Sequence, residues 1–311
     1  MKVNLVAYLD ANYLHKALVC YDSLRNFYAG KFRMYVYCFD KITFDILSKY
    51  NLEDLIPIPK EEFEIPEILA QKSSKKSYEY FWTYTPTVLL QTMIIRPKNE
   101  IVVYMDTDMM FFDSPQSIFD ELEDKDVLIQ PNNFSVNERW QFEPIGYYCT
   151  SFNVFRNNEN STKIVENWQK QCIEWCGATL GDGRFGDQKY MDFWLDEYEG
   201  VREVTTVGAD VAPWNIQKYD VSNRNGKVFV NNKPLIYYHF HSFKMNFSDY
   251  SYMIEGDRDN CYDIREDAIK HIYTPYIKAM KDKIILLKQE PLFQKYVARN
   301  PEGNVGWYGN E

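Results

Sequence analysis

Apolar runs typical of β-strands alternate with amphipathic stretches typical of helices along the first part of the chain. The run KVNLVAYL (residues 2–9) is followed by a helical pattern over about residues 12–28. The run FRMYVYCFD (32–40) is followed by a short helical pattern in TFDILSKY (43–50). Because parallel strands need crossover connections of this kind, the alternation predicts an α/β fold with a mostly parallel sheet.

The middle of the sequence predicts a helix that leads into a buried strand. Thr85 offers a hydroxyl N-cap and Pro86 a favoured first helical residue, so a helix is expected from there to about Arg96, before Pro97. The run EIVVYMD (100–106) then has the continuous apolar character of a strand buried on both faces.

Further elements follow the same two periodicities. Strands are expected in KDVLIQ (125–130), TSFNVFR (150–156) and KPLIYYHFHSFK (233–244), and helices in TKIVENWQKQCIEWC (162–176), in GDQKYMDFWLDEY (186–198) and over residues 264–299. The last helical region is amphipathic, with apolar side chains near helical spacing at Ile269, Ile272, Tyr276, Met280, Ile284 and Leu287.

Charge and hydropathy exclude some classes of protein. The 311 residues carry a formal net charge of −10, which argues against general nucleic-acid binding. No apolar run approaches the roughly 20 residues of a membrane span. The first residues lack the features of a signal peptide, so a cytoplasmic protein is expected. The tail at 264–299 has eight Lys or Arg against four Asp or Glu, which allows at most a peripheral membrane contact.

Two aspartates directly after the buried strand are the strongest functional signal. Asp106 and Asp108 stand one residue apart where the strand at 100–106 ends, and the apolar run MMFF resumes at once. Carboxylates beside an apolar strand are costly unless something compensates their charge. Ligands of open α/β sheets bind at the carboxyl ends of strands, and carboxylate oxygens suit Mg²⁺ or Mn²⁺. The pair therefore predicts a metal site that also holds a diphosphate.

Histidines in the last predicted strand could complete such a site. Strand alternation places His239 and His241 on one face, and Lys244 follows shortly after. Imidazole is a reasonable ligand for Mn²⁺ and a poorer one for Mg²⁺. A single strand histidine is more often a hydrogen-bonded core residue than a ligand, so both interpretations stay open at this point.

Several short motifs together resemble one enzyme family. The segments YMDTDMMFF, FGDQKYMDFW, APWN and YYHFHSFK occur in the order seen in GT-A-fold nucleotide-sugar glycosyltransferases of family 8, the glycogenin and bacterial lipopolysaccharide galactosyltransferase group. A set of bacterial glycosyltransferases that also carries EYFWT-x-TP and EWC is closer still. This resemblance extends from LDANYL to HSFK and implies a Rossmann-like, mixed and mostly parallel sheet flanked by helices.

The resemblance implies roles for particular residues. Asp106, Asp108 and His239 match the family's metal ligands, and Thr107 lies where relatives contact the donor ribose. Lys244 lies close to a lysine that contacts the donor phosphates.

Further matches concern the base and the sugar. Asp10, Asn12 and Tyr13 match the turn that holds the uracil base. Asp187 matches a residue that binds donor-sugar hydroxyls, and Gln188 one that lies by the anomeric carbon. The segment APWN adds Asn215 as a sugar contact and Trp214, with His241, as neighbours of the metal or acceptor site. Ser242 stands where relatives have glycine.

These observations predict a metal-dependent glycosyltransferase. It would use Mn²⁺ or Mg²⁺ to move a hexose or related sugar from a UDP-sugar to a hydroxyl of a glycan, lipid-linked or other acceptor. The family precedent is retention of anomeric configuration and a role in bacterial surface-glycan synthesis. A catalytic domain over residues 1–260 and a helical extension packed on it over 261–311 are expected.

Other functions remain open from the residues alone. A haloacid-dehalogenase-type phosphatase places its DxD after the first strand, and an EF-hand needs further oxygen ligands and a glycine. A nucleotidyltransferase would need a glycine- and lysine-rich first loop, which YLDANYL lacks. A hydrolase of nucleotide sugars and a non-catalytic nucleotide-sugar-binding protein are the remaining alternatives.

Overall fold

The computed structural model describes residues 2–179, 183–254 and 262–301, and they form two compact units. The first unit comprises Met1–Tyr8, Gly30–Asp106 and Ser117–Thr205, and the second comprises Leu9–Ala29, Thr107–Gln116 and Thr206–Glu311. The chain passes between the units at Asp106–Thr107, within the Asp-x-Asp motif. The predicted domain boundary after residue 260 lies outside the described residues and stays a prediction.

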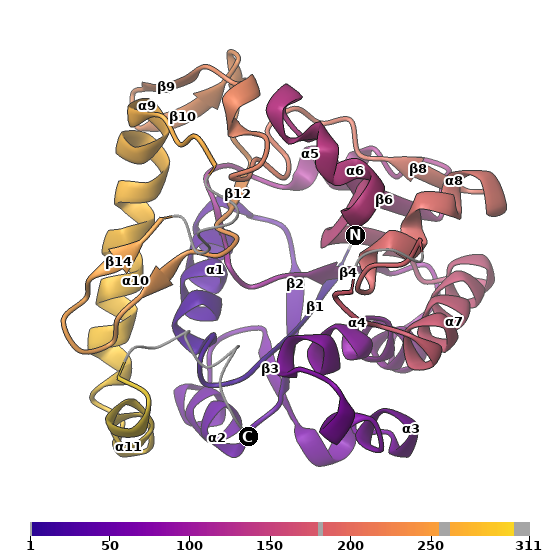
Figure 1. Cartoon of the computed structure of the whole chain (residues 1–311), viewed down its shortest axis with the longest axis horizontal. Coiled ribbons are helices and arrows are strands. Elements are labelled where there is room, and N and C mark those ends of the chain that lie inside the picture. The colour runs from indigo at the N-terminus through magenta and orange to yellow at the C-terminus, as the bar shows by residue number, and fades with distance from the viewer. Residues whose placement is uncertain (1, 180–182, 255–261, 302–311) are drawn as a thin grey trace. The chain divides into compact units, whose positions relative to one another are not determined.

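The first unit is built on a mixed, mostly parallel sheet (Figure 1). The strand order is β3-β2-β1-β4-β7-β6-β8. Parallel pairs are β2 with β3, β1 with β4 and β6 with β8, whereas β7 runs antiparallel to both β4 and β6. The strands are β1 (Val3–Leu9), β2 (Phe32–Cys38), β3 (Leu55–Pro59), β4 (Ile101–Met105), β6 (Val127–Pro131), β7 (Tyr148–Arg156) and β8 (Val201–Glu203). The predicted fold class is confirmed.

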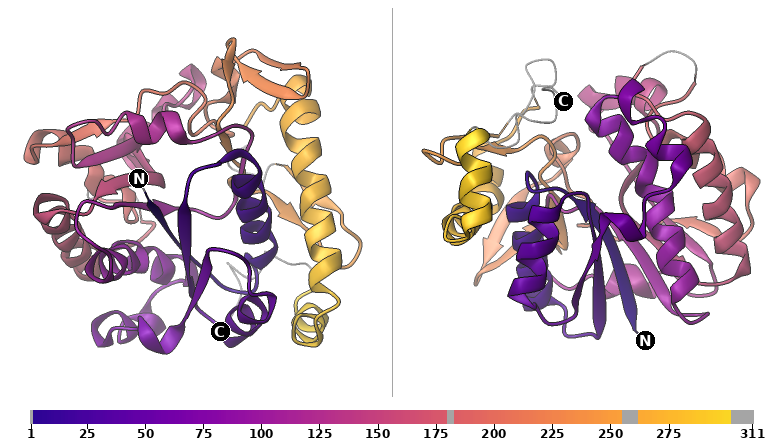
Figure 2. Two further views of the ribbon diagram at one scale, coloured as in Figure 1. Left: turned by 180° about the vertical axis from the view of Figure 1, so that it is seen from behind. Right: turned by 90° about the horizontal axis from the view of Figure 1, so that it is seen from below.

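Helices α4 (Ser77–Ile95) and α7 (Glu159–Glu174) pack side by side against this sheet (Figure 2). Trp168 of α7 and Tyr84 of α4 are fully buried in one hydrophobic cluster with Tyr104 of β4. Burying each such side chain contributes roughly 2–3 kcal/mol, which fixes the helices against β4. The smaller helices are α2 (Lys41–Tyr50), α3 (Pro66–Leu69), α5 (Gln116–Asp120), α6 (Phe142–Ile145) and α8 (Trp194–Glu197).

Helix α4 differs from its prediction. It begins at Ser77, so Thr85 and Pro86 lie in its interior and Thr85 is not an N-cap. An interior proline costs about 3 kcal/mol, but the extra turns bury Tyr80 and Tyr84. The Glu79 side chain also accepts a hydrogen bond from the backbone N–H of Lys76 and stabilises the true start. Burial of the aromatic turns thus outweighs the proline signal.

The predicted helix over residues 186–198 is also only partly formed. Its first part is the 3₁₀ helix η4 (Gln188–Phe193), and only α8 is α-helical. Its predicted opening loop GDGRFG lies partly outside the described residues.

The second unit places α1 (Leu14–Phe27) against β5 (Met109–Phe111) and α10 (Thr274–Leu287). Strand β12 (Tyr237–His239) pairs antiparallel with β5, in a register that sets His239 opposite Met109. The Ser23 hydroxyl of α1 accepts a hydrogen bond from the backbone N–H of Phe111. These contacts hold the residues that follow Asp106 against the first helix.

The predicted strand at 233–244 is divided into three short strands. These are β11 (Lys233–Pro234), β12 and β13 (Lys244–Met245). Strand β11 pairs with β10 (Lys227–Val230), which also pairs with β9 (Val221–Arg224); β12 pairs with β5, and β13 pairs with β14 (Tyr252–Met253). Between the first two strands, the backbone N–H groups of Ile236 and Tyr237 donate to the Gly208 carbonyl. Only glycine fits at position 208, because a Cβ there would lie 2.1 Å from the carbonyl oxygen of Pro234. Ser242 has φ +59° and turns the chain after β12. This left-handed conformation favours glycine, so Ser242 occupies a position at which glycine would be less strained.

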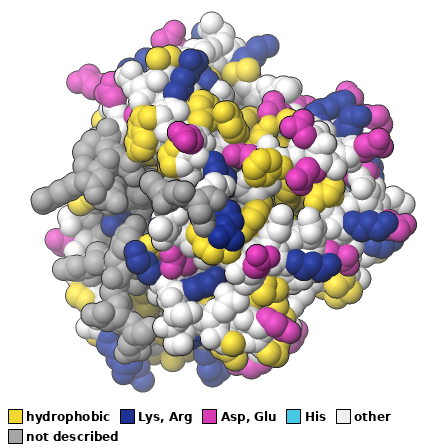
Figure 3. All heavy atoms as spheres, turned by 45° about the vertical axis from the view of Figure 1, so that its right-hand side comes forward, with side chains coloured by type: hydrophobic (Ala, Val, Ile, Leu, Met, Phe, Trp, Pro, Cys, Tyr) yellow, Lys and Arg dark blue, Asp and Glu magenta, His cyan; other side chains and the backbone are white. Residues whose placement is uncertain are grey.

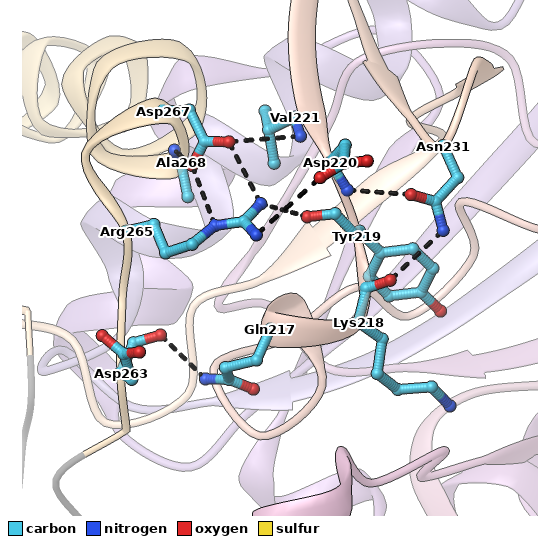
Figure 4. A network of polar contacts seen from close by, with 10 residues as sticks. All are labelled: Gln217, Lys218, Tyr219, Asp220, Val221, Asn231, Asp263, Arg265, Asp267 and Ala268. Carbon is cyan, nitrogen blue, oxygen red and sulfur yellow. Dashed lines mark hydrogen bonds and ion pairs between the residues drawn. The ribbon is translucent and has the colours of Figure 1, made fainter.

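The C-terminal helices form largely as predicted. They are α9 (Glu266–Ala268), the π-helical turn η6 (Ile269–Tyr273), α10 and α11 (Pro291–Arg299), and the predicted apolar face of Ile272, Tyr276, Met280, Ile284 and Leu287 is buried. Arg265 joins their start to the β9–β10 hairpin through the carbonyl of Tyr219 and the carboxylate of Asp267 (Figure 4). The Asp267 carboxylate in turn accepts from the Val221 N–H.

Hydrophobic side chains are interspersed with acidic and basic ones on the face drawn in Figure 3. Within the described part of the chain, no helix combines the length and the apolar character that crossing a bilayer requires.

Candidate functional site

Asp108 and His239 face each other within the second unit. The pairing of β5 with β12 and the hydrogen bond from the Phe240 N–H to the Asp108 carbonyl bring the two residues together. A carboxylate oxygen of Asp108 lies 3.2 Å from Nε2 of His239, and both side chains are buried. The sequence predicted both residues for one site, and the structure places them in contact.

Lys16 is a buried cation beside the same carboxylate. It is 1 % exposed, its Nζ lies 3.7 Å from the second carboxylate oxygen of Asp108, and it also sits 4.3 Å from the ring centre of Tyr13. Burial lowers the pKa of Lys16, although the Asp108 charge partly opposes this. Burial alone would raise the pKa of Asp108, but His239 and Lys16 hold it well below its usual range. Asp108 is therefore ionised and charge-compensated.

Sequence reasoning missed Lys16. The available signal is weak: it is the only lysine in the apolar helix LHKALVCY, three residues after the predicted donor-binding Tyr13.

His239 has a second carboxylate on its other side. Nδ1 of His239 lies 3.6 Å from an oxygen of Asp210, which is also buried. The rings of His239 and His241 both lie edge-on to Trp214, with centres 5.3 and 5.6 Å away, which confirms that the two histidines share one side. A carboxylate on the far nitrogen is the usual way to orient a metal-binding histidine. Asp210 was not predicted, because only the fold brings it to β12.

Asn215 is used within its own loop. Its side-chain oxygen accepts from the Ala212 N–H at 2.9 Å, and its amide donates to the Asp210 carbonyl at 2.9 Å. It thereby holds the segment that carries Asp210 and Trp214. Its predicted contact with a sugar stays a prediction.

The predicted donor-base residues form a tight turn before α1. The Asp10 carboxylate accepts from the Asn12 N–H at 2.9 Å, and the Tyr13 N–H donates to the Asp10 carbonyl at 3.0 Å. The Tyr296 hydroxyl of α11 donates to the Asn12 side chain. Lys244 lies half-buried on β13, and its charge contributes to the lowered pKa of Lys16.

Asp187 and Gln188 lie in the first unit, at the start of η4. The Asp187 carbonyl accepts from the indole N–H of Trp168 at 2.8 Å, and the Gln188 amide donates to the Ile145 carbonyl at 3.1 Å. Asp187 is 4 % exposed. Burial, opposed by a hydrogen bond from Thr85 and reinforced by the charge of Asp106, raises the pKa of Asp187 to about 7.

Hydroxyl groups fill the space around Asp187 and Asp106. Thr85 contacts the Tyr8 hydroxyl at 3.1 Å, and the Tyr104 hydroxyl donates to Asp106 at 3.0 Å. The backbone N–H of Asp106 donates to the Ser151 carbonyl and so continues the β4–β7 ladder by one residue. Thr85 reaches Tyr8 and Asp187 from the interior of α4. Because the sequence predicted Thr85 as an N-cap at the start of this helix, its contact with Asp187 was not predicted.

The structure thus divides the predicted residues between the units. Asp106, Asp187 and Gln188 belong to the first unit, and all other predicted site residues, including the buried Thr107, belong to the second. Carboxylate and imidazole donors at the end of a central strand can hold a divalent cation. Together with the mixed sheet, they agree with the GT-A glycosyltransferase architecture that the sequence resemblance implies.

Comparison with known proteins identifies the family. The model of the nucleotide-diphospho-sugar transferase family matches residues 33–287, and the chain belongs to that family. The Bacillus subtilis (strain 168) protein YfnD is 32 % identical over 255 residues, which is 80 % of each chain. YfnF of the same strain is 28 % identical over 244 residues, covering 76 % of this chain and 80 % of YfnF.

Solved structures agree on the fold. The structure of an active-site mutant of LgtC superposes with a TM-score of 0.51 at 15 % identity, covering 76 % of this chain and 87 % of that one. The apo form of the glycosyltransferase GlyE of Streptococcus pneumoniae TIGR4 gives a TM-score of 0.50 at 10 % identity, covering 97 % and 64 %. At these identities the likeness establishes the architecture alone.

Proposed function

We propose that the protein transfers a hexose or related sugar from a UDP-sugar to an acceptor hydroxyl, with retention of anomeric configuration and with Mn²⁺ or Mg²⁺ as cofactor. The observation that carries this proposal is the contact between the buried side chains of Asp108 and His239, with Asp106 two residues before Asp108. It occurs in a member of the nucleotide-diphospho-sugar transferase family. A role in bacterial surface-glycan synthesis is part of the proposal and rests on the family resemblance.

The donor atoms suit the proposed cation. Asp108 provides a carboxylate oxygen, and His239 provides the ring nitrogen Nε2, while its other nitrogen, Nδ1, faces Asp210. Asp106 lies two residues before Asp108 along the chain. This mixture of hard oxygen and imidazole donors favours Mn²⁺ over Mg²⁺. When bound there, a divalent cation would stabilise the charge that develops on the diphosphate leaving group.

The residues around this pair would bind the rest of the donor. Lys16 keeps Asp108 ionised and, with Lys244, adds positive charge where a diphosphate would lie. Asp10, Asn12 and Tyr13 form the preorganised turn that we assign to the base, and Thr107 is assigned to the ribose. We assign Asp187 and Gln188 to the donor sugar from the family resemblance. A retaining transfer needs no dedicated base aimed at the acceptor, so neither residue is assigned that role.

A donor panel tests the proposal. Purified protein is incubated with UDP- and GDP-sugars, with Mn²⁺ or with EDTA, and release of nucleoside diphosphate is measured. We expect release from at least one UDP-sugar that EDTA abolishes. If no donor is turned over and none raises the melting temperature, the proposed function is wrong.

Product stereochemistry tests the retaining assignment separately. The anomeric proton of the transferred sugar is followed by NMR from an α-linked donor. An α-linked product is expected, whereas a β-linked product would show inversion and would direct attention to Asp187 as the base.

A further inference from the structure

An exposed group of aromatic side chains follows strand β6. The 3₁₀ helix η3 (Val136–Gln141) and α6 connect β6 to β7, and this connection carries Trp140, Phe142 and Tyr147, hereafter the aromatic segment. Trp140 is 58 % exposed and Tyr147 is 55 % exposed. Large apolar side chains in contact with solvent on one short connection indicate a binding surface.

The aromatic segment is held firmly. The rings of Phe142 and Tyr147 are stacked, with centres 4.8 Å apart, and the buried Phe134 supports Phe142 edge-on at 5.1 Å. The buried Asn132 donates to the carbonyls of Gly146 and Tyr148, each at 2.9 Å. Because these rings are already ordered, a ligand that contacts them loses little conformational entropy of the protein.

The same connection is joined to the proposed sugar site. The Gln188 amide donates to the Ile145 carbonyl, and the Tyr147 N–H donates to the Asp192 carboxylate at 2.7 Å. Both hydrogen bonds lead to η4, the 3₁₀ helix that begins with Gln188. The aromatic segment is therefore continuous with the residues assigned to the transferred sugar.

We propose that the aromatic segment binds a neutral pyranose ring of the acceptor, an inference that rests on the proposed function. Flat aromatic side chains offer a surface on which the C–H face of a sugar ring can lie. The nearby cation Lys189 is already paired with Asp192 at 3.6 Å and donates to the Glu143 carbonyl. On the connection itself, the exposed Arg139 is accompanied by two acidic residues, Glu138 and Glu143. With Lys189 compensated and no excess of positive charge on this connection, the surface favours an uncharged sugar over an anionic ligand.

Substitution of single rings tests the inference. Methyl glycosides of glucose, galactose and N-acetylglucosamine serve as acceptor probes, and the donor is the UDP-sugar that the panel selects. We expect Trp140→Ala or Tyr147→Ala to raise the acceptor KM about tenfold or more, a loss of about 1.4 kcal/mol. Donor KM and nucleoside diphosphate release without acceptor stay unchanged. Ile94→Ala, at an apolar residue that is 69 % exposed on α4, is the matched control and leaves acceptor KM unchanged.

The outcomes separate this inference from the proposed function. If no donor is turned over at all, the proposed function fails first. If wild-type protein uses donor but the two aromatic variants match Ile94→Ala in acceptor KM, the inference is wrong. It is also wrong if no methyl glycoside gives saturation transfer by NMR from wild-type protein, or if the variants change only self-association or binding to phosphatidylglycerol vesicles.

Discussion

Two buried aspartates, Asp108 and Asp187, have opposite surroundings. Asp108, in the second unit, is 7 % exposed and lies beside Lys16 and His239, so its pKa is lowered. Asp187, in the first unit, is 4 % exposed and has Thr85 as its hydrogen-bonding neighbour and the charge of Asp106 nearby, so its pKa is raised to about 7. Similar burial thus accompanies a lowered pKa for Asp108 and a raised pKa for Asp187.

The difference separates two kinds of chemistry. A carboxylate that stays ionised at every working pH can hold a cation, and the cost of burying it is offset by Lys16 and His239. A carboxyl group that keeps its proton up to neutral pH can donate as well as accept hydrogen bonds, which suits contacts with sugar hydroxyls. The proposed metal and sugar roles therefore agree with the surroundings of each residue.

The strongest test of this contrast is Asp108→Asn. Loss of a carboxylate ligand is expected to lower kcat at saturating donor by at least about a hundredfold, because substitution of residues outside the ligand shell already costs 10- to 100-fold in metalloproteins. The buried Lys16 also loses its ion pair with Asp108, so the free energy of unfolding should fall by roughly 3 kcal/mol. Steady-state rates with Mn²⁺ and urea unfolding measure the two effects.

A double variant separates lost charge pairing from lost metal binding. In Lys16→Met/Asp108→Asn the buried cation is removed together with the carboxylate that compensated it, so much of the stability returns while kcat stays low. Wild-type activity in either variant would exclude the metal role of Asp108. Equal stability of the single and double variants would show that Lys16 does not compensate Asp108.

The fold could be predicted well from the sequence because periodicity and strand–helix alternation report local structure. The buried strand β4 and the amphipathic C-terminal helices are examples. Predictions failed where tertiary contacts override a local signal. Burial of Tyr80 and Tyr84 extends α4 through Pro86, and between β11 and β12 the backbone of the predicted late strand donates to the Gly208 carbonyl.

Only the site residues that belong to a recognisable motif could be predicted from the sequence. Asp108 and His239, 131 positions apart in the sequence (239 − 108), were placed together from the resemblance, and the structure brings them to 3.2 Å. Lys16 and Asp210 carry no motif of their own and enter the site because α1 packs on β5 and because residues 206–215 lead into the β12 region. Their roles depend on three-dimensional neighbours that sequence spacing does not encode.

The raised pKa of Asp187 predicts that the free energy of unfolding depends on pH. The native pKa of Asp187, about 7, exceeds the unfolded value of about 3.9, so the native state keeps a proton that the unfolded chain releases between these values. The free energy of unfolding should therefore fall as the pH rises from about 4 to 7, by roughly 4 kcal/mol from this group. Asp108 acts in the reverse direction, and its contribution is lost as the pH falls below about 4.

Urea unfolding in EDTA across pH 4 to 8 measures this slope. Asp187→Asn is the matched variant, because an amide of similar shape carries no titrating proton. It should flatten the curve between pH 4 and 7 and be more stable than wild-type protein at pH 8. An identical slope in both proteins would show that Asp187 titrates as an ordinary exposed carboxyl group.

The smallest expected effect concerns the hydrogen bond from the Tyr104 hydroxyl to Asp106. Tyr104→Phe removes the hydrogen bond to the Asp106 carboxylate and should lower the free energy of unfolding by about 1.5 kcal/mol. Activity with Mn²⁺ should fall about fivefold, an estimate from the loss of about 1 kcal/mol of ligand positioning. Tyr37→Phe is the control, since it removes a buried hydroxyl contact to Thr92 and touches no carboxylate. A similar activity loss in both variants would mean that Tyr104 acts through stability alone. The hydrogen bond from its hydroxyl would then have no specific role in positioning Asp106.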